Sequence, residues 1–364
     1  MAEGNTTQFF LGSNSGCGFY SYFDAFYDPT KMRRVFLLKG GAGNGKSTLM
    51  KKIARAAALQ GLHTEQIRCP SDPNSLDAVR VVETGVAVID ATPPHAREAE
   101  FHGLPEYYIS LSPYIHTVGL EADRAEVMEL TASVKECHAA ARKRLAAAYS
   151  VSNSALALVL DGVHSERLSK RGAALARRYI PKRHGVTSTK ARKRFLSAVT
   201  PRGLVACIDT PQSLCGNPAQ TTAIAVHDRF GLSPFVLSPL LEEALQNGYE
   251  TYACYSPLVP SCLTGVIVPE LSLFAAVAEH GFFDTYPHCR NLRLNDAVDP
   301  DVLRQSRSRL RILRQAEAAL IDDACDTLAE ALRYHDALEA VYKRHTDYSG
   351  LDRLAEILLA ECLA

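Results

Sequence analysis

The chain of 364 residues repeats itself. Residues that match between its two halves keep nearly the same spacing and the same order, as a duplication leaves them. The matched positions are Phe10/Phe195, Leu11/Leu196, Gly18/Gly203 and Asp24/Asp209 at a spacing of 185, Gly61/Gly248, Thr64/Thr251, Pro70/Pro257 and Glu83/Glu270 at 187, and Leu145/Leu328, Ala146/Ala329 and Ala148/Ala331 at 183. The sequence therefore predicts two copies of one fold, at about 8–181 and 193–364.

Each copy follows the same order of short apolar runs and amphipathic stretches. Apolar runs at 35–38 and 223–226 predict buried strands, and a helical pattern follows each of them. Further apolar runs lie at 86–89 and 271–275. The order strand, helix, strand is typical of βαβ units. We expect an α/β fold, with a parallel sheet flanked by helices in each copy.

Both copies then end in long helical stretches. Apolar residues recur at helical spacing at Val127, Leu130, Val134, Cys137, Ala141 and Leu145, and at Leu320, Ala324, Leu328, Ala331, His335 and Leu338. These stripes predict packed helices, with His335 as a packed side chain, and a surface for a protein partner is the alternative. The expected organisation is a first domain with its helical arm at 1–181, a basic linker at 182–192, and a second domain with its arm at 193–364.

Composition excludes several classes of protein. Forty Lys and Arg balance forty Asp and Glu, so a nucleic-acid-coating protein is not indicated. No apolar run approaches the roughly 18 residues of a membrane span, and the first residues do not resemble a secretory signal. The ten cysteines form no C-x-x-C pair, which indicates reduced thiols. We expect a cytoplasmic protein without a membrane segment.

The strongest local signal is a complete G-x-x-x-x-G-K-[ST] motif between the apolar run at 35–38 and a helical pattern. Glycines allow successive backbone N–H groups to point at phosphates, and the helix N-terminus adds partial positive charge. Lys46 is expected to reach the β- and γ-phosphates, and the hydroxyl of Ser47 to bind Mg²⁺. The predicted nucleotide-binding residues are Gly40, Gly41, Ala42, Gly43, Asn44, Gly45, Lys46, Ser47 and Thr48.

An acid at the end of a neighbouring strand should complete the magnesium site. Asp90 closes the apolar run at 86–89 and is the predicted metal ligand, with Lys46 as its partner in catalysis. Ala91 stands where hydrolytic proteins with the G-x-x-x-x-G-K-[ST] motif usually carry a glutamate. The group that activates water is therefore unassigned. Thr92 and His95 are candidates for contact with the γ-phosphate, and a histidine without a role is the alternative for His95.

The second copy lacks this motif. At a spacing of 187, Lys46 corresponds to Ser233 and Ser47 to Pro234, and the counterpart of Asp90 is near Val277. Loss of the lysine removes the charge that faces phosphate, and a proline removes a backbone donor. We expect the second copy to be a degenerate nucleotide fold, so that only the first copy binds a nucleotide tightly.

Residues 167–194 carry eleven Lys and Arg, and the nearest acid is Glu166. The simplest interpretation is a solvated helix face and linker. The alternatives are a lid that reaches phosphate over the first-copy site, or a nucleic-acid patch. Tyr179 is the only aromatic residue among these charges, which argues against stacking on single strands.

The sequence resembles an uncharacterised family of bacterial proteins with two tandem P-loop domains, labelled only as ATPases. The blocks that carry the resemblance are 10–12, 18–22, 39–50, 69–73 and 90–95 in the first copy, and 198–203 and 269–271 in the second. The resemblance implies a P-loop NTPase fold in both halves and nucleotide binding at 40–48, with no known substrate. Typical members also keep a Gly-Lys-Ser loop in the second copy, whereas residues 227–234 here read HDRFGLSP.

These observations predict an ATP-binding protein that depends on Mg²⁺ and has slow or partner-stimulated ATPase activity. One alternative is a small-molecule or nucleotide kinase, in which the missing glutamate keeps water from reacting. A second alternative is a non-enzymatic scaffold that is gated by a nucleotide and binds a protein through its helical arms.

Overall fold

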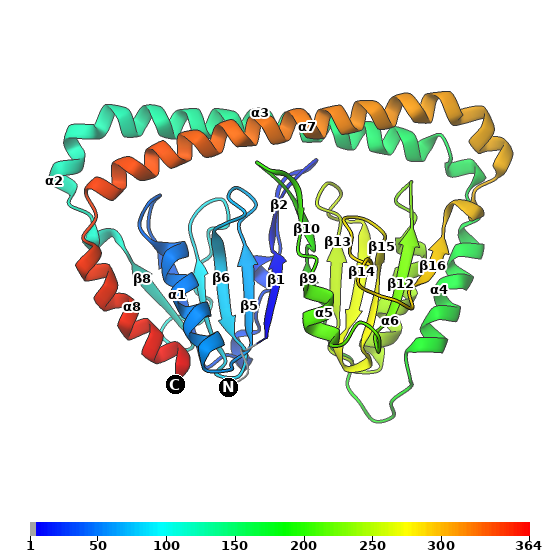
Figure 1. Cartoon of the computed structure of the whole chain (residues 1–364), viewed down its shortest axis with the longest axis horizontal. Coiled ribbons are helices and arrows are strands. Elements are labelled where there is room, and N and C mark those ends of the chain that lie inside the picture. Colours follow the sequence, from blue (N-terminus) through cyan, green and yellow to red (C-terminus); the bar gives the residue numbers. More distant parts are fainter. Residues whose placement is uncertain (1–4) are drawn as a thin grey trace.

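A computed structural model describes residues 5–364, which form two six-stranded sheets side by side beneath a pair of long helices (Figure 1). The first sheet has the order β1-β5-β6-β7-β4-β8. Its strands are β1 (Thr6–Phe10), β4 (Arg34–Lys39), β5 (Thr64–Arg68), β6 (Leu76–Val81), β7 (Val86–Asp90) and β8 (Glu106–Ser110).

The second sheet repeats this arrangement strand for strand, in the order β9-β13-β14-β15-β12-β16. Its strands are β9 (Arg192–Arg194), β12 (Thr222–His227), β13 (Tyr252–Tyr255), β14 (Leu263–Val268), β15 (Leu273–Val277) and β16 (Arg290–Arg293). Each copy also has a two-stranded ribbon, β2 (Gly12–Ser15) with β3 (Gly18–Ser21), and β10 (Ser197–Thr200) with β11 (Gly203–Ala206). The common strand order supports the predicted duplication.

Both sheets are mixed, so the prediction of parallel sheets was wrong in one strand of each. β6 runs antiparallel to β5 and β7, and β14 runs antiparallel to β13 and β15. Only residues 82–85 join β6 to β7, which is long enough for an antiparallel neighbour but far too short for a parallel crossover. The remaining neighbours, including β4 with β7 and β8, are parallel as expected.

Eight helices surround the sheets in the described part of the chain. They are α1 (Lys46–Leu59), α2 (Thr117–Leu120), α3 (Arg124–Ala157), α4 (Ser165–Tyr179), α5 (Thr210–Cys215), α6 (Pro234–Gln246), α7 (Pro300–Arg344) and α8 (Tyr348–Leu363). No helix within residues 5–364 combines the length and apolar character that a bilayer span requires. All ten cysteines are free thiols.

The helical arms are exchanged between the two sheets. α3 leaves the first sheet and crosses to the second, where α4 packs against α6 (Figure 1). α7 runs back beside α3, and α8 packs against α1 of the first sheet. Leu145 and Leu328 are both buried in the apolar seam between the two long helices, which confirms the prediction that each helix packs through its apolar stripe. Each sheet is therefore covered by the arm that follows the other sheet in the sequence.

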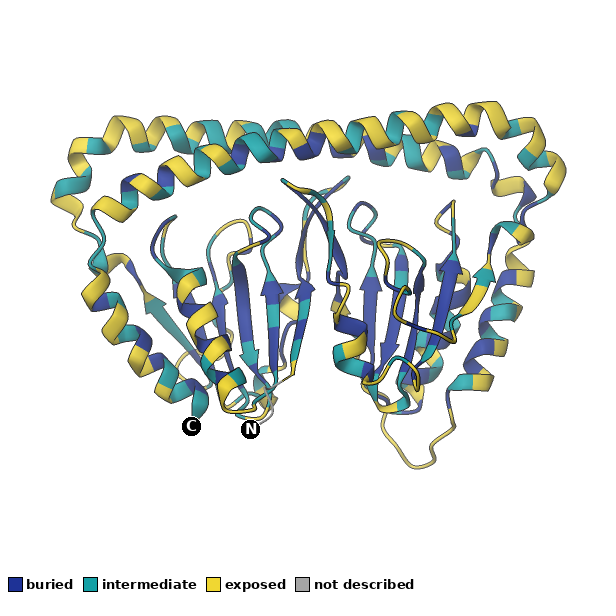
Figure 2. Ribbon diagram, in the orientation of Figure 1, coloured by how far each residue is buried: buried dark blue, intermediate teal, exposed yellow. Residues whose placement is uncertain are grey.

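The two sheets join at their edges, where the backbones of Phe10 and Phe195 exchange hydrogen bonds of 3.0 and 2.9 Å. Around this contact the cores of both copies merge into one buried cluster, and the ring of Phe9 stacks on that of Tyr252. Buried residues follow the strands of both sheets and continue through this junction, whereas the outer helix faces are exposed (Figure 2). The two copies thus share a core.

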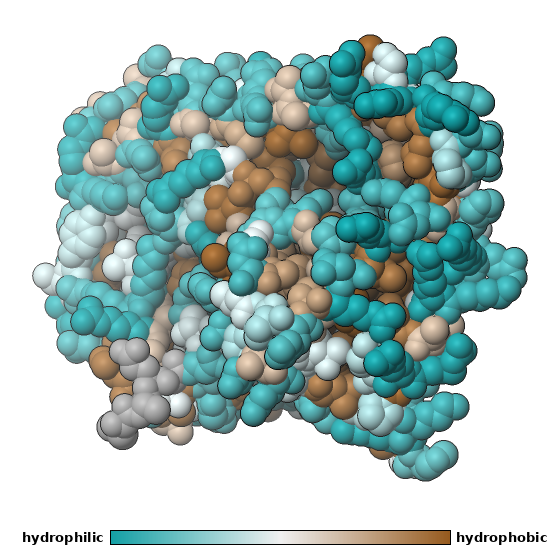
Figure 3. All heavy atoms as spheres, turned by 45° about the vertical axis from the view of Figure 1, so that its right-hand side comes forward, coloured by the Kyte–Doolittle hydropathy of each residue, from teal (hydrophilic) through white to brown (hydrophobic). Residues whose placement is uncertain are grey.

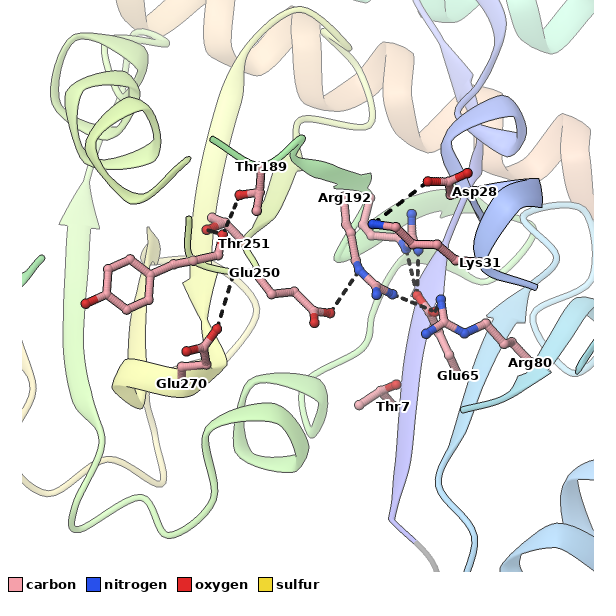
Figure 4. Close-up of polar contacts among 12 residues, drawn as sticks. Thr7, Asp28, Lys31, Glu65, Arg80, Thr189, Arg192, Glu250, Thr251 and Glu270 are labelled. Atoms are coloured by element: carbon pink, nitrogen blue, oxygen red, sulfur yellow. Dashed lines mark hydrogen bonds and ion pairs between the residues drawn. The ribbon is translucent and has the colours of Figure 1, made fainter. Parts of the chain in front are cut away.

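A buried cluster of charges lies beside the aromatic junction. Oε1 of Glu65 on β5 is 2.7 Å from Nη2 of Arg194 on β9, and Arg194 is fully buried. Arg80 from the first sheet and Arg192 from the second flank the same carboxylate at 3.7 and 3.9 Å (Figure 4). Arg192 also pairs with the half-exposed Glu250. One carboxylate of the first copy therefore faces arginines from both copies.

Candidate functional site

The predicted glycine motif forms a tight loop, residues 40–45, between β4 and α1. Gly43 and Gly45 have φ angles of 70° and 76°, in the left-handed region that favours glycine. A Cβ on Gly43 would lie 2.9 Å from the carbonyl oxygen of Glu339 on α7. These two positions therefore require glycine, one of them because a helix from the second half lies directly on the loop.

Lys46 begins α1 and folds back over the loop. Its Nζ donates to the carbonyl oxygens of Gly40 and Gly41, both at 2.7 Å, and lies 3.6 Å from Oδ2 of Asp90. The hydroxyl of Ser47 accepts a hydrogen bond of 3.0 Å from the backbone amide of Leu76, at the start of β6. The first turn of α1 is thus held against the glycine loop and the ends of two strands.

Asp90 lies where its position after an apolar run predicts. β7 is the parallel neighbour of β4, so its C-terminal end adjoins the glycine loop. Oδ1 of Asp90 accepts hydrogen bonds from the amide and the hydroxyl of Thr92, at 3.0 and 2.5 Å. Oδ2 is left facing Lys46. The fold therefore brings the predicted lysine, serine and aspartate together.

A second carboxylate, which the sequence did not reveal, adjoins Asp90. β6 and β7 pair with Ala78 opposite Ile89, so Asp77 lies one step along, opposite Asp90. Asp77 is only 4% exposed, and its Oδ2 has no hydrogen-bond partner within the described residues. Burial, the largest cause, raises the pKa of Asp77 to about 6, with His95 lowering it and Asp90 raising it. The signal available in the sequence was an acid between two apolar residues, Leu76 and Ala78, at the start of β6.

His95 does not occupy the place proposed for it. Its ring is 8% exposed and stacks on Phe23 with a centroid distance of 4.7 Å. Neither ring nitrogen has a partner within residues 5–364. His95 lies outside the lining of the cavity, and Thr92 is engaged with Asp90. Thr92 therefore holds Asp90 in place, whereas His95 packs on Phe23 outside the cavity lining.

A cavity of about 260 Å³ opens above the glycine loop, Asp77 and Asp90. Its other wall comes from the exchanged arm: Ala331, Leu332, His335, Glu339 and Lys343 of α7, and Tyr348 at the start of α8. His138 of α3 joins them. His335, predicted as a packed helix residue, instead lines this cavity. Sequence periodicity identified the helix but could not show that one edge of it covers a site in the other copy.

The side chains of α3, α7 and α8 that line the cavity form a roof over the glycine loop, and several ionisable groups lie close together in it. Nζ of Lys343 lies 2.8 Å from Oε2 of Glu339, one turn earlier on α7, and the pair raises the pKa of Lys343. Burial lowers the pKa of His138, and the nearby charges of Arg142 and His335 lower it further. The roof therefore contains an ion-paired lysine and two histidines, and Asp77 and Asp90 line the same cavity.

The corresponding loop of the second copy is aligned one residue differently from the sequence prediction. β12 ends at His227 and α6 begins at Pro234, a shift of 188 from β4 and α1. Lys46 therefore corresponds to Pro234, not to Ser233, because the loop keeps its length between strand and helix. Val277 closes β15, as Asp90 closes β7, in agreement with the prediction. Both alignments leave the second loop without a lysine.

A carboxylate of the chain itself occupies the second loop. Asp228 accepts hydrogen bonds from the backbone amides of Phe230 and Ser233, at 2.9 and 2.6 Å. The equivalent amides in the first loop have no carboxylate partner among the hydrogen bonds of residues 5–364. The N–H groups that a phosphate would need are therefore already bonded in the second copy.

The basic segment 167–194 does not cover the first-copy site, so the lid alternative was wrong. α4, which carries five of these eleven charges, packs on α6 of the second copy. Arg192 and Arg194 at its end face Glu65 between the sheets. The lid alternative failed because α3 carries α4 away from the first sheet.

Comparisons with protein-family models, with curated proteins and with solved structures found no match to this chain.

Proposed function

We propose that the protein binds ATP with Mg²⁺ in the first copy and hydrolyses it slowly, or faster when a partner stimulates it. The observation that carries this proposal is the meeting of Lys46 and Asp90 at the mouth of a strand–glycine loop–helix unit, 3.6 Å apart. A strand, a loop with left-handed glycines and a helix N-terminus form a binding site for phosphate groups. On binding, Lys46 exchanges the carbonyl oxygens of Gly40 and Gly41 for phosphate oxygens.

The residues present fit a magnesium ion. Mg²⁺ prefers hydroxyl and carboxylate oxygens and usually keeps waters, with one or two carboxylates plus substrate phosphates. Ser47 and Asp90 would hold the ion, and the unpartnered Oδ2 of the buried Asp77 is a third oxygen beside them. The described residues contain no group of three or more His, Cys, Asp and Glu side chains that could hold a metal by themselves, and in this proposal substrate phosphates and waters complete the shell. Bound Mg²⁺ would neutralise the charge that develops on the phosphates.

The roof explains why slow turnover is expected. The cavity of about 260 Å³ is slightly below the range of roughly 300–1,000 Å³ usual for small-molecule sites, so we expect α7 to move outward when a nucleotide enters. Ala91 supplies no group to orient water. Without such a group, or a cation aligned on the γ-phosphate, P-loop proteins can be slower by about 10³–10⁵-fold. Lys343 and His335 are the roof residues that a partner could bring into alignment.

The same roof favours a second candidate function, transfer of the phosphoryl group to an acceptor other than water. A helix that closes over the site excludes water, which a kinase requires. In this alternative the roles of Lys46, Ser47 and Asp90 are unchanged. Release of phosphate only when an acceptor is supplied would distinguish the kinase from the ATPase.

The test is phosphate release from Mg·ATP by wild-type protein and by Lys46→Ala, with nucleotide-dependent thermal stabilisation measured in parallel. We expect a slow rate in the wild type and neither rate nor stabilisation in Lys46→Ala. Lys135→Ala, an exposed lysine on α3, is the matched control and should behave as wild type. Equal stabilisation of Lys46→Ala by ATP would refute the proposed site. Stabilisation of the wild type without release would favour the kinase or a nucleotide-gated scaffold.

A further inference from the structure

The first part of α7 carries an unusual concentration of arginine. Residues 302–316 contain five arginines and no acid: Arg304, Arg307, Arg309, Arg311 and Arg314. Four of them, at spacings of three and four residues, lie along one face of the helix and line a groove with a volume of about 1,000 Å³. Like charges one turn apart destabilise a helix, so this face is costly unless something neutralises it.

The second copy adds a further arginine to this groove. Arg229, in the loop that corresponds to the glycine loop, lies across from the helix, and the ring of Phe230 packs 5.4 Å below the guanidinium of Arg314. Burial lowers the pKa of Arg314, and the charge of Arg229 lowers it further, while Glu317 on the next turn raises it. Arg229 and Arg314 are therefore close enough for their charges to repel, and the adjoining cavity that both line also contains Asp228, Glu279 and Glu317.

Ion pairs within the described chain neutralise little of this charge. Arg304 pairs with Asp301 at the start of α7. Arg229, Arg307, Arg311 and Arg314 have no acidic group within 4 Å among residues 5–364. Elsewhere in the molecule, by contrast, Arg144 and Arg183 are paired with acids. The groove is thus a local positive field in a protein whose net charge is zero.

The basic surface continues from the groove to α4. Asn295 lines the groove close to β16, where Nη1 of Arg171 on α4 donates to the carbonyl oxygen of Arg293. Arg290 on the same strand donates to the hydroxyl of Tyr179. Figure 3 turns this end of the molecule forward, and hydrophilic residues dominate its right-hand side. The structure therefore joins the basic segment of the sequence to a second arginine cluster that lies more than a hundred residues later.

We propose that this arginine groove, lined by Arg229, Arg304, Arg307, Arg311 and Arg314, binds the phosphodiester backbone of a nucleic acid. Guanidinium groups match phosphate oxygens in a planar, bidentate geometry, and the cluster contains arginine without lysine. From Arg304 to Arg314 the helix rises about 15 Å, enough to follow several consecutive phosphates. The one aromatic ring, Phe230, is buried, so the groove binds backbone and does not stack on bases.

The test is the salt dependence of binding to a fluorescein-labelled 20-nucleotide single strand, followed by anisotropy between 50 and 200 mM KCl. Five phosphate contacts predict a slope of log K against log[salt] of about −3.5, at about 0.7 per contact. Arg307→Gln combined with Arg311→Gln should reduce the slope by about 1.4 and weaken binding at 50 mM KCl at least tenfold. Both side chains are exposed, so the fold should tolerate the changes.

The matched control is Arg142→Gln combined with Lys143→Gln, which removes the same charge from exposed positions on α3. This control, and Lys46→Ala, should bind the oligonucleotide as wild type does, because the groove is separate from the first-copy site. Three results would overturn the proposal: no binding at 50 mM KCl, equal losses in the control and the arginine variant, or tighter binding of inorganic tripolyphosphate than of the oligonucleotide. The last would identify a compact anion as the ligand.

Discussion

Arg194 places its guanidinium 2.7 Å from the carboxylate of Glu65 in a fully buried position, and this pair joins the second copy of the fold to the first. The two residues come from different sheets, and their pairing lies beside the stacked rings of Phe9 and Tyr252. A buried charge is tolerated only while it is paired, so neither side chain can be replaced independently.

We predict that Glu65→Gln destabilises the protein by about 3–5 kcal/mol, because it leaves Arg194 buried without a counter-charge. Urea unfolding at pH 7 measures the change. Glu250→Gln, which breaks the half-exposed pair with Arg192, is the control and should cost less than about 1 kcal/mol. Equal effects of the two substitutions would contradict the assignment of Glu65 as the anchor between the copies.

The same carboxylate predicts a loss of stability in acid. Burial raises the pKa of Glu65, but Arg194, Arg80 and Arg192 outweigh it, and the net pKa is lowered from its ordinary value of 4.5. A lowered acid pKa contributes stability above the ordinary value, and this is lost as the pH falls through the folded value. Unfolding measured between pH 6 and pH 3 should show this loss in the wild type and a smaller one in Glu65→Gln.

The raised pKa of Asp77 predicts a pH dependence of stability with the opposite sign. Its pKa is raised from 3.8 to about 6, chiefly by burial, so the stability that its neutral form contributes is lost as the pH rises from 4 through 6. Asp77→Asn should therefore raise the free energy of unfolding of the nucleotide-free protein at pH 8, by at most about 3 kcal/mol. The same variant should need a higher concentration of Mg²⁺ for nucleotide binding. Asp72→Asn, which changes another acid in the wall of the same cavity, is the control. Asp77→Asn that is less stable than wild type at pH 8 would show that its carboxylate has a partner there.

The second loop predicts one bound nucleotide per chain. Asp228→Ala frees the amides of Phe230 and Ser233 and should destabilise the protein by about 1–3 kcal/mol. It should create no second site, because Pro234 stands where the first copy has its lysine. Pro234→Lys alone should also fail, since Asp228 still occupies the amides. Equilibrium dialysis with a non-hydrolysable ATP analogue gives the number of sites, and two per wild-type chain would refute the degenerate second copy.

Packing of α8 on α1 predicts that the last helix supports the first-copy site. Leu358 is 1% exposed in the cluster with α1, and its neighbour Ile357 is 62% exposed. Leu358→Ala should cost about 2–5 kcal/mol and weaken ATP binding, because it loosens the helix that continues from the roof. Ile357→Ala should change neither property measurably. Chemical denaturation and nucleotide titration of the two variants provide the comparison.

Much of the site could be predicted from local sequence, because its chemistry lies within short segments. A strand followed by glycines, Lys46 and a helix has one compact arrangement, and Asp90 at the end of an apolar strand falls beside it when that strand pairs with β4. Asp77 could not be placed in the same way. Its role depends on β6 running antiparallel beside β7. An antiparallel hairpin inside an otherwise parallel sheet cannot be recognised from the periodicity of apolar residues.

The arms were harder to predict for another physical reason. Helical periodicity shows that α3, α7 and α8 each have an apolar face, but every such face is chemically similar, so the pattern does not name its partner. Leu328 meets Leu145 of the other copy, and Leu358 meets the core around α1. His335 illustrates the consequence, since its place on a stripe indicates packing whereas its location over the glycine loop follows from the exchange.

The exchange of arms also fixes the order in which the molecule can be completed during translation. The glycine loop is synthesised early, but α7 and α8, which roof it, follow only after the entire second sheet. At roughly 5–20 residues per second, the loop waits on the order of tens of seconds for its cover. A nascent chain, or a fragment released before α7 is made, therefore exposes an unfinished cavity, so that assembly of the first-copy site itself reports that the second copy has been made.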